Sequence, residues 1–174
     1  MSWFVVDVES DGQIPGPDFY SMVCFGAVRV DEAMKTTFYG KTKPISKKWL
    51  PEALAISGFS REQHLTFDEP VDVMSEFANW LAANSIGRPV LISDNNGYDA
   101  AFINYYFHAY YGRNPFGFSS RRIGDLYCGM QKDAFAKWKH LRDEPHLHSP
   151  VQDALGNVQA LIKMKKMGLR IPSQ

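Results

Sequence analysis

A short apolar segment near the N-terminus constrains this chain more than any other feature. Residues Trp3–Val8 are mostly aromatic or β-branched, which is typical of a strand buried on both faces. Two acids, Asp7 and Glu9, end the segment, and residues two apart in a strand project from the same face. The pattern therefore predicts a buried sheet with two carboxylates side by side at the end of one strand, while Val8 points into the core.

The rest of the chain continues with segments that fit a sheet and surrounding helices. We predict further strands at Ser21–Val30, Thr36–Thr42 and Arg88–Ser93. We predict helices at Trp49–Ile56, Pro70–Asn84 and Tyr98–Tyr110, and a short helical turn from Arg61 capped by Ser60. Residues Asn114–Arg122 are predicted to be a loop, and Asp125 the cap of the next helix. This order predicts an α/β domain with a mixed sheet.

The last helix has clear boundary signals. Ser149 to Gln152 matches a capping box, with Pro150 at the first helical position, and Gly168 follows the final turn. Two residues therefore fall at informative places: Asp153 lies in the first turn, and His148 lies in the loop before it.

Length and composition set the class of protein. The 174 residues fit one domain, residues 1–174, and 45% hydrophobic content is enough for a packed core. No apolar run approaches the roughly 20 residues of a membrane span, and no signal peptide is recognisable. Cys24 and Cys128 match no metal-ligand spacing, so we expect reduced thiols in a cytoplasmic protein with no membrane partner.

The net charge argues about partners. Nineteen basic and nineteen acidic side chains balance, whereas proteins that coat long nucleic acids carry a basic excess. A general duplex binder is disfavoured. An enzyme that binds a few nucleotides at a strand end is still compatible, because metal ions supply local positive charge there.

Four acids occur where a strand ends or a helix begins. Asp7 and Glu9 end the first strand, and Asp99 and Asp153 lie in first turns, which is where α/β folds gather ligand sites. Four carboxylates without a cysteine ligand suit Mg²⁺ or Mn²⁺. Two such ions could hold the attacking and leaving oxygens of a phosphodiester displacement, with neutral His148 as the base for water.

Three segments resemble the motifs of the DEDDh 3′–5′ exonucleases of the DnaQ-like, ribonuclease H-like superfamily. Phe4–Glu9 resembles the first motif, a strand ending D-x-E. Ser93–Phe107 resembles the second, with the family asparagine on Asn95 and the metal-binding aspartate on Asp99. His148–Leu155 resembles the third, H-x-x-x-x-D-A, and the motifs occur in the family's order.

The resemblance implies fold, activity and site. It implies a ribonuclease H-like α/β fold with a central mixed β-sheet flanked by α-helices. It also implies release of nucleoside 5′-monophosphates from the 3′ end of single-stranded RNA or DNA by two divalent cations, Mg²⁺ or Mn²⁺. The implied ligands are Asp7, Glu9, Asp99 and Asp153, with Glu9 and His148 as catalytic residues. The chain looks closest to compact bacterial exoribonucleases, so RNA is the first expectation, DNA the alternative, and a homodimer is allowed for.

Substrate contacts and departures from the family pattern are named separately. We predict substrate contacts at Val8, Ser10, Phe25, Ile56, Asn95 and Arg121. For Phe25, as for any single aromatic side chain, packing in the core is the favoured alternative. Asp94 stands where many relatives have histidine, and Ser10-Asp11 where proofreading relatives have threonines. The charged stretch Lys137–His148 is expected to be a mobile flap over the bound strand end.

Two readings from other classes compete. Asp7-x-Glu9-x-Asp11-Gly12 partly imitates a calcium-binding EF-hand loop, although a strand rather than a helix is predicted before it. A catalytically idle nucleic-acid-binding module is the other reading, disfavoured because every catalytic position is filled. His146 shares the loop of His148 but not its motif position, and we expect it to face solvent.

Overall fold

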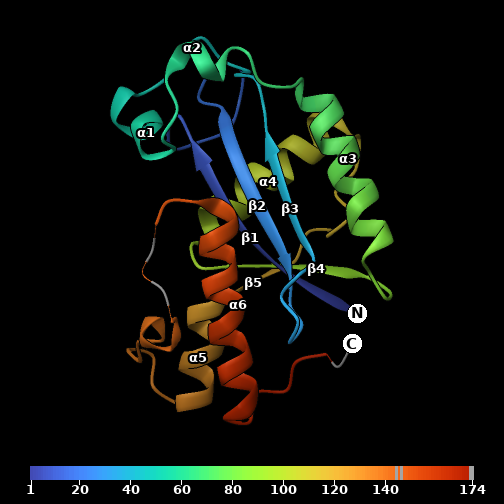
Figure 1. The fold of residues 1–174 in the computed structure, drawn as a ribbon, viewed down its shortest axis with the longest axis vertical. Helices are drawn as coiled ribbons and strands as arrows, with labels where there is room; N and C mark the ends of the chain where they lie inside the picture. Colours follow the sequence, from blue (N-terminus) through green and yellow to red (C-terminus); the bar gives the residue numbers. More distant parts are fainter. Residues whose placement is uncertain (144, 146, 173–174) are drawn as a thin grey trace.

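A mixed sheet forms the centre of the molecule, as predicted, and it has five strands, one more than the four predicted (Figure 1). The computed structural model describes residues 1–143, 145 and 147–172. The strands are β1 Ser2–Ser10, β2 Met22–Arg29, β3 Thr37–Lys41, β4 Pro89–Ser93 and β5 Ser120–Arg122. Their order is β3-β2-β1-β4-β5, with β2 antiparallel to β1 and β3, and with β1, β4 and β5 parallel. The carboxyl ends of β1 and β4 therefore lie at the same edge of the sheet.

Helices cover both faces of this sheet. They are α1 Pro51–Ile56, α2 Arg61–His64, α3 Pro70–Ala83, α4 Asn96–Tyr110, α5 Ile123–Gln131, the 3-10 helix η1 Lys139–Leu141, and α6 Pro150–Lys166. In Figure 1, α6 crosses in front of the strands and α4 lies behind them. One core packs α3 and α4 against one face, and a second packs α5 and α6 against the other. None of the helices in the described part of the chain is long and apolar enough to span a membrane.

Strand β1 is buried along its whole length because both faces are covered. Phe4, Val6 and Val8 join the core on the α3–α4 side, while Trp3 and Val5 join the core on the α5–α6 side. This confirms the alternation predicted from the sequence: Val8 points into a core, and Asp7 and Glu9 continue the α5–α6 side.

Three local predictions were wrong. The predicted loop Asn114–Arg122 contains β5, whose three residues are too few to show a periodic pattern. Asp125 lies in the first turn of α5, whose N-cap is Arg122. Ser149 is the N-cap of α6, but its side chain makes no cap hydrogen bond, so the predicted capping box is wrong.

Candidate active site

The end of β1 meets the start of α6 at a glycine. Gly26 in β2 is the register partner of Asp7, and a Cβ there would lie 2.5 Å from backbone atoms of Pro150 and Val151. Only a residue without a side chain lets the first turn of α6 approach the sheet this closely. The approach brings Asp153, in that first turn, to the carboxylates of β1.

Asp99 reaches the same place from the other layer. It lies in the first turn of α4, is 3% exposed, and its Oδ1 accepts a hydrogen bond of 3.1 Å from the backbone N–H of Val8. This bond joins Asp99 to Val8, the residue that lies between Asp7 and Glu9 in β1. The structure therefore gathers all four predicted acids from β1, α4 and α6.

Burial and mutual repulsion perturb these acids strongly. Burial, and then the charges of Asp99, Glu9 and Asp153, raise the pKa of Asp7 well above its usual value. Burial raises the pKa of Glu9 to about 7 despite the nearby His148. The pKa of Asp99 also rises to about 7, because burial outweighs its hydrogen bonds from Ser93 and Val8. A compensating positive charge would relieve this cost.

Arg142 supplies part of the compensating positive charge, and no sequence pattern had indicated this residue. Its Nη2 lies 2.8 Å from Oδ1 of Asp153, and both side chains are buried. The backbone N–H groups of Leu147 and Ser149 also donate to Asp153, at 3.0 Å each. A Cβ on Gly156 would lie 2.8–3.1 Å from the Arg142 guanidinium, so this glycine makes room for it.

The carboxylates do not form a ready-made cage. No group of three or more His, Cys, Asp or Glu side chains is arranged around one metal-sized position, within the residues that the structure describes. Asp153 is turned to Arg142 instead. Asp7, however, has a buried Oδ2 without a hydrogen-bond partner among the described residues, and an orphaned buried carboxylate oxygen fits a cation ligand.

His148 lies beside this cluster in a strained backbone. Its φ of 53° is in the left-handed region, and its Nδ1 lies 3.6 Å from Oε1 of Glu9. The side chain is 55% exposed, so solvent reaches it. His146 lies outside the described residues. The predicted flap Lys137–His148 is anchored within its length by buried Trp138 and Arg142.

Predicted substrate contacts fared unevenly. Phe25 is fully buried and its ring packs against Phe38 and Phe77, so its assignment as a substrate contact was wrong. The core alternative holds because β2 is an inner strand of the sheet. The side chain of Val8 is buried as well, so a side-chain contact there is also wrong. Ser10 is 2% exposed, and its Oγ lies 2.5 Å from the Tyr98 hydroxyl.

The remaining contacts divide between two places. Ile56 is half-exposed on α1, which packs against β1. Asn95 is exposed just before α4 and lines a cavity beside the acids. Arg121 instead lies over the ring of Trp3, close to Met1 and far along β1 from Asp7, so the structure does not bring it to the site. Its neighbour Arg122 lines the cavity with Asn95, because successive residues of a strand face opposite ways.

The calcium-loop reading is wrong. Asp7 and Glu9 belong to a strand, and Asp11 is committed elsewhere. Its Oδ2 lies 2.8 Å from Nη1 of Arg61 in α2, and its Oδ1 accepts 2.6 Å from the N–H of Ser21. Asp11 thus fixes the turn that follows Glu9.

Comparisons with known proteins agree with this arrangement. The 3′–5′ DNA exonuclease Cap18 of Escherichia coli is 39% identical to this chain over 142 residues, covering 79% of this chain and 72% of Cap18. No protein-family model matches the chain.

Solved structures share the fold at low identity. The nuclease domain of 3′hExo, a DEDDh family member bound to rAMP, matches with a TM-score of 0.77 and 17% identity, covering 99% of this chain and 96% of that one. The zinc-bound complex of E. coli exonuclease I with single-stranded DNA matches with a TM-score of 0.65 and 19% identity, covering 95% of this chain and 39% of that one. By its relation to Cap18, its ribonuclease H-like fold and the gathered acids of its three motifs, the chain belongs to the DEDDh 3′–5′ exonuclease family.

Proposed function

We propose that this protein removes nucleoside 5′-monophosphates from the 3′ end of single-stranded DNA, using divalent cations held by Asp7, Glu9, Asp99 and Asp153. The observation that carries the proposal is the convergence of these four buried acids at the end of β1, with the pKa of three of them raised. Structural carboxylates are normally paired with cations in the fold, whereas perturbed and partly unpaired acids gather at functional sites.

The acids fit Mg²⁺ or Mn²⁺ by their chemistry. All four offer hard oxygen ligands, and Asp7 Oδ2 lacks a hydrogen-bond partner among the described residues. Divalent cations, when bound, stabilise the negative charge that develops on the phosphoryl and leaving oxygens. Asp153 would exchange its bond to Arg142 for such a ligand role, which leaves the guanidinium beside the site.

His148 is proposed as the general base. It lies next to Glu9 and is open to solvent, so it can take a proton from an attacking water. Glu9 beside its Nδ1 would stabilise the imidazolium that results, as a carboxylate partner does for other catalytic histidines. The left-handed backbone at His148 fixes the direction in which the ring leaves the chain.

DNA is placed first because Cap18, which is 39% identical, is described as a DNA exonuclease. The sequence-based preference for RNA stays a prediction, since a structurally similar 3′-exonuclease recognises a histone mRNA stem-loop. An idle binding module is the remaining alternative. One assay addresses all three.

The test uses matched 5′-labelled single-stranded DNA and RNA, with Mg²⁺ or Mn²⁺ against chelator. We expect a ladder shortened from the 3′ end, faster on DNA, and lost with chelator or in Asp7→Ala and Asp153→Ala. Faster digestion of RNA would reverse the substrate assignment. Metal-independent activity, or full activity in either variant, would overturn the ligand set, and no digestion of either strand would support the idle module.

A further inference from the structure

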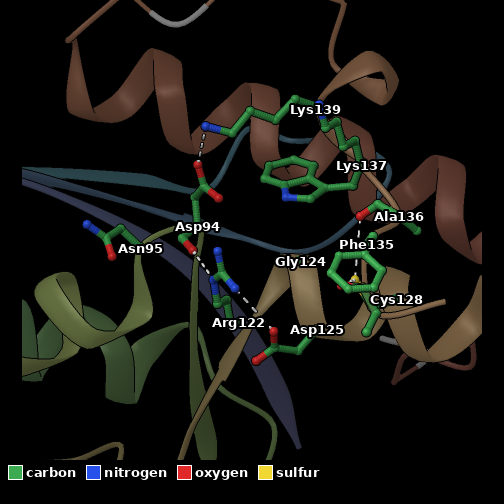
Figure 2. A pocket seen from close by; sticks show the side chains of 12 residues that line it. Asp94, Asn95, Arg122, Gly124, Asp125, Cys128, Phe135, Ala136, Lys137 and Lys139 are labelled. Atoms are coloured by element: carbon green, nitrogen blue, oxygen red, sulfur yellow. Dashed lines mark hydrogen bonds and ion pairs between the residues drawn. The ribbon is translucent and has the colours of Figure 1, made fainter.

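A cavity opens beside the second-motif residues Asp94 and Asn95, which precede α4 and its Asp99. It has a volume of about 590 Å³ and lies between the end of β4 and the segment Ala134–Lys139 (Figure 2). Its size falls in the range of small-molecule sites, roughly 300–1,000 Å³, and suits one nucleotide. Neither the four acids nor His148 lines it.

Residues on two walls of the cavity are linked through the backbone to residues that contact proposed metal ligands. Asp94 and Asn95 form one wall, and the backbone N–H of Asp99 donates to the carbonyl of Asn95. Lys139 stands on the other wall, three residues before Arg142, which bonds Asp153. The charge of Asp94 on the cavity wall also acts on Asp99, which places the cavity next to the proposed metal ligands.

The residues that line the cavity provide positive charge and an exposed aromatic ring, which together bind a nucleotide without base specificity. Three cations, Arg122, Lys137 and Lys139, face two acids, Asp94 and Asp125, which leaves an excess of one positive charge. Phe135 is 89% exposed on the rim, where an isolated aromatic side chain gains nothing from packing. Basic groups with an exposed aromatic are the usual combination for single strands.

An ion pair joins two residues that line the cavity. Nζ of Lys139 lies 2.8 Å from Oδ2 of Asp94, and Nε of Arg122 donates to the carbonyl of Asp94 at 3.2 Å. Figure 2 shows Asp94 between these two cations. Asp94 is the position that departs from the family histidine, so this residue shapes the cavity in this chain.

The geometry of an exonuclease decides which nucleotide belongs here. The scissile phosphate lies at the acids and joins the terminal nucleotide to its 5′ neighbour, so the two nucleotides lie on opposite sides of the acids. Half-exposed Ile56 lies on α1, whereas the cavity is lined by residues of α5, and Figure 1 shows these two helices at opposite ends of the same side of the molecule.

We propose that this cavity is the subsite for the nucleotide that precedes the 3′-terminal one, with its base against Phe135 and its phosphate met by Lys137, Lys139 and Arg122. The assignment rests on the proposed function for its direction along the strand. In this assignment, the cavity residues determine the affinity for a nucleic-acid strand, and other groups bind the terminal nucleotide.

The test compares binding with hydrolysis in Phe135→Ala and in Lys137→Ala/Lys139→Ala. Binding is measured by fluorescence anisotropy of a 5′-labelled thymidine tetranucleotide. Hydrolysis is measured on the tetranucleotide and on the p-nitrophenyl ester of thymidine 5′-monophosphate, which has no 5′ neighbour. Phe118→Ala, another exposed phenylalanine (98%) but outside this cavity, and Lys43→Ala are the matched controls.

We expect both cavity variants to weaken tetranucleotide binding, and to raise its KM, by about fivefold or more, the worth of one stacked base. Hydrolysis of the ester should change by less than about twofold, and the controls should match the wild type. Unchanged tetranucleotide binding, or an equal loss on the ester, would overturn the subsite. Wild-type binding that depends on the cavity without any hydrolysis would uphold the subsite and reject the proposed function instead.

Discussion

Asp99 is a buried acid whose single backbone donor, the N–H of Val8, does not offset the loss of its hydration. Its pKa of about 7 means that the folded protein holds a proton that the unfolded chain has lost above about pH 4. The native state therefore binds more protons than the unfolded state in this window, and its stability falls as pH rises from about 4 to 7.

Asp99→Asn should stabilise the metal-free protein above pH 7, because the amide oxygen still accepts from Val8 and the charge is gone. The upper limit of the gain is about 4 kcal/mol, the equivalent of the pKa shift. Denaturant unfolding in chelator should show the full gain at pH 8 and little at pH 4, near the pKa of the unfolded carboxyl. A gain of equal size at both pH values would mean that repulsion at Asp99 is not the cause.

The effect of metal on stability tests whether Asp99 is a metal ligand. Mn²⁺ bound only to the folded state should raise the melting temperature of the wild type, and should raise that of Asp99→Asn much less. A wild-type melting temperature indifferent to metal would contradict a site at these acids.

His148→Ala should lower turnover by about 10²–10⁴-fold, the usual contribution of a general base. Its effect on the Mn²⁺-induced rise in melting temperature should be small, since the ring is not a proposed ligand. His108→Ala is the control, because His108 is exposed near the far end of α4 from Asp99. A variant of His148 as active as the control would remove the DEDDh assignment of this residue.

At the scale of elements, one contact sets the geometry of the site. The first turn of α6 rests on β2 at Gly26, and this brings Asp153 to Asp7 across two layers. Asp7 lies on β1 beside Gly26, and Asp153 lies on α6. The distance between α6 and the sheet therefore decides whether these two acids meet.

Gly26→Ala should destabilise the protein by about 1–3 kcal/mol, because its methyl group would overlap backbone atoms of Pro150 and Val151 that cannot turn away. Activity should fall further than stability explains, since α6 must shift and move Asp153. Gly129→Ala in α5 is the matched control: a Cβ there meets nothing within 4 Å, and alanine should raise helix stability by up to about 1 kcal/mol. Thermal unfolding and the nuclease assay together measure both effects, and a fully active Gly26→Ala would show that the spacing is not critical.

At the scale of the whole molecule, charge is balanced, with 19 basic and 19 acidic side chains. Under the proposed function, phosphate affinity would then be concentrated at the cations held by the four acids and in the proposed subsite. The part of a nucleic-acid strand beyond these few nucleotides meets a protein surface with no net positive charge overall.

Affinity should therefore depend weakly on salt. For two or three phosphates on a single strand, the slope of log Kd against log salt concentration should have a magnitude of about 1.4–2.1. Oligonucleotides of four and of twenty nucleotides should bind about equally. A slope several times steeper, or tighter binding with each added nucleotide, would indicate an extended basic path instead.

Local sequence determined much of this protein. The buried strand ending in Asp7 and Glu9, the Pro150 start of α6, the Ser60 cap of α2, and the order of the four predicted strands among the helices were all confirmed. Such features are readable because they depend on alternation, turn chemistry and helix starts, which are properties of neighbouring residues.

Only the tertiary structure decided which side chains share a place. It buried Phe25, turned Arg121 away and put Arg122 at the cavity, since a one-residue step along a strand reverses the facing direction. It also paired Arg142 with Asp153 and Lys139 with Asp94, residues 11 and 45 positions apart in the chain. Ion pairs of this kind depend on the path of the backbone in space, which no local pattern of residues records.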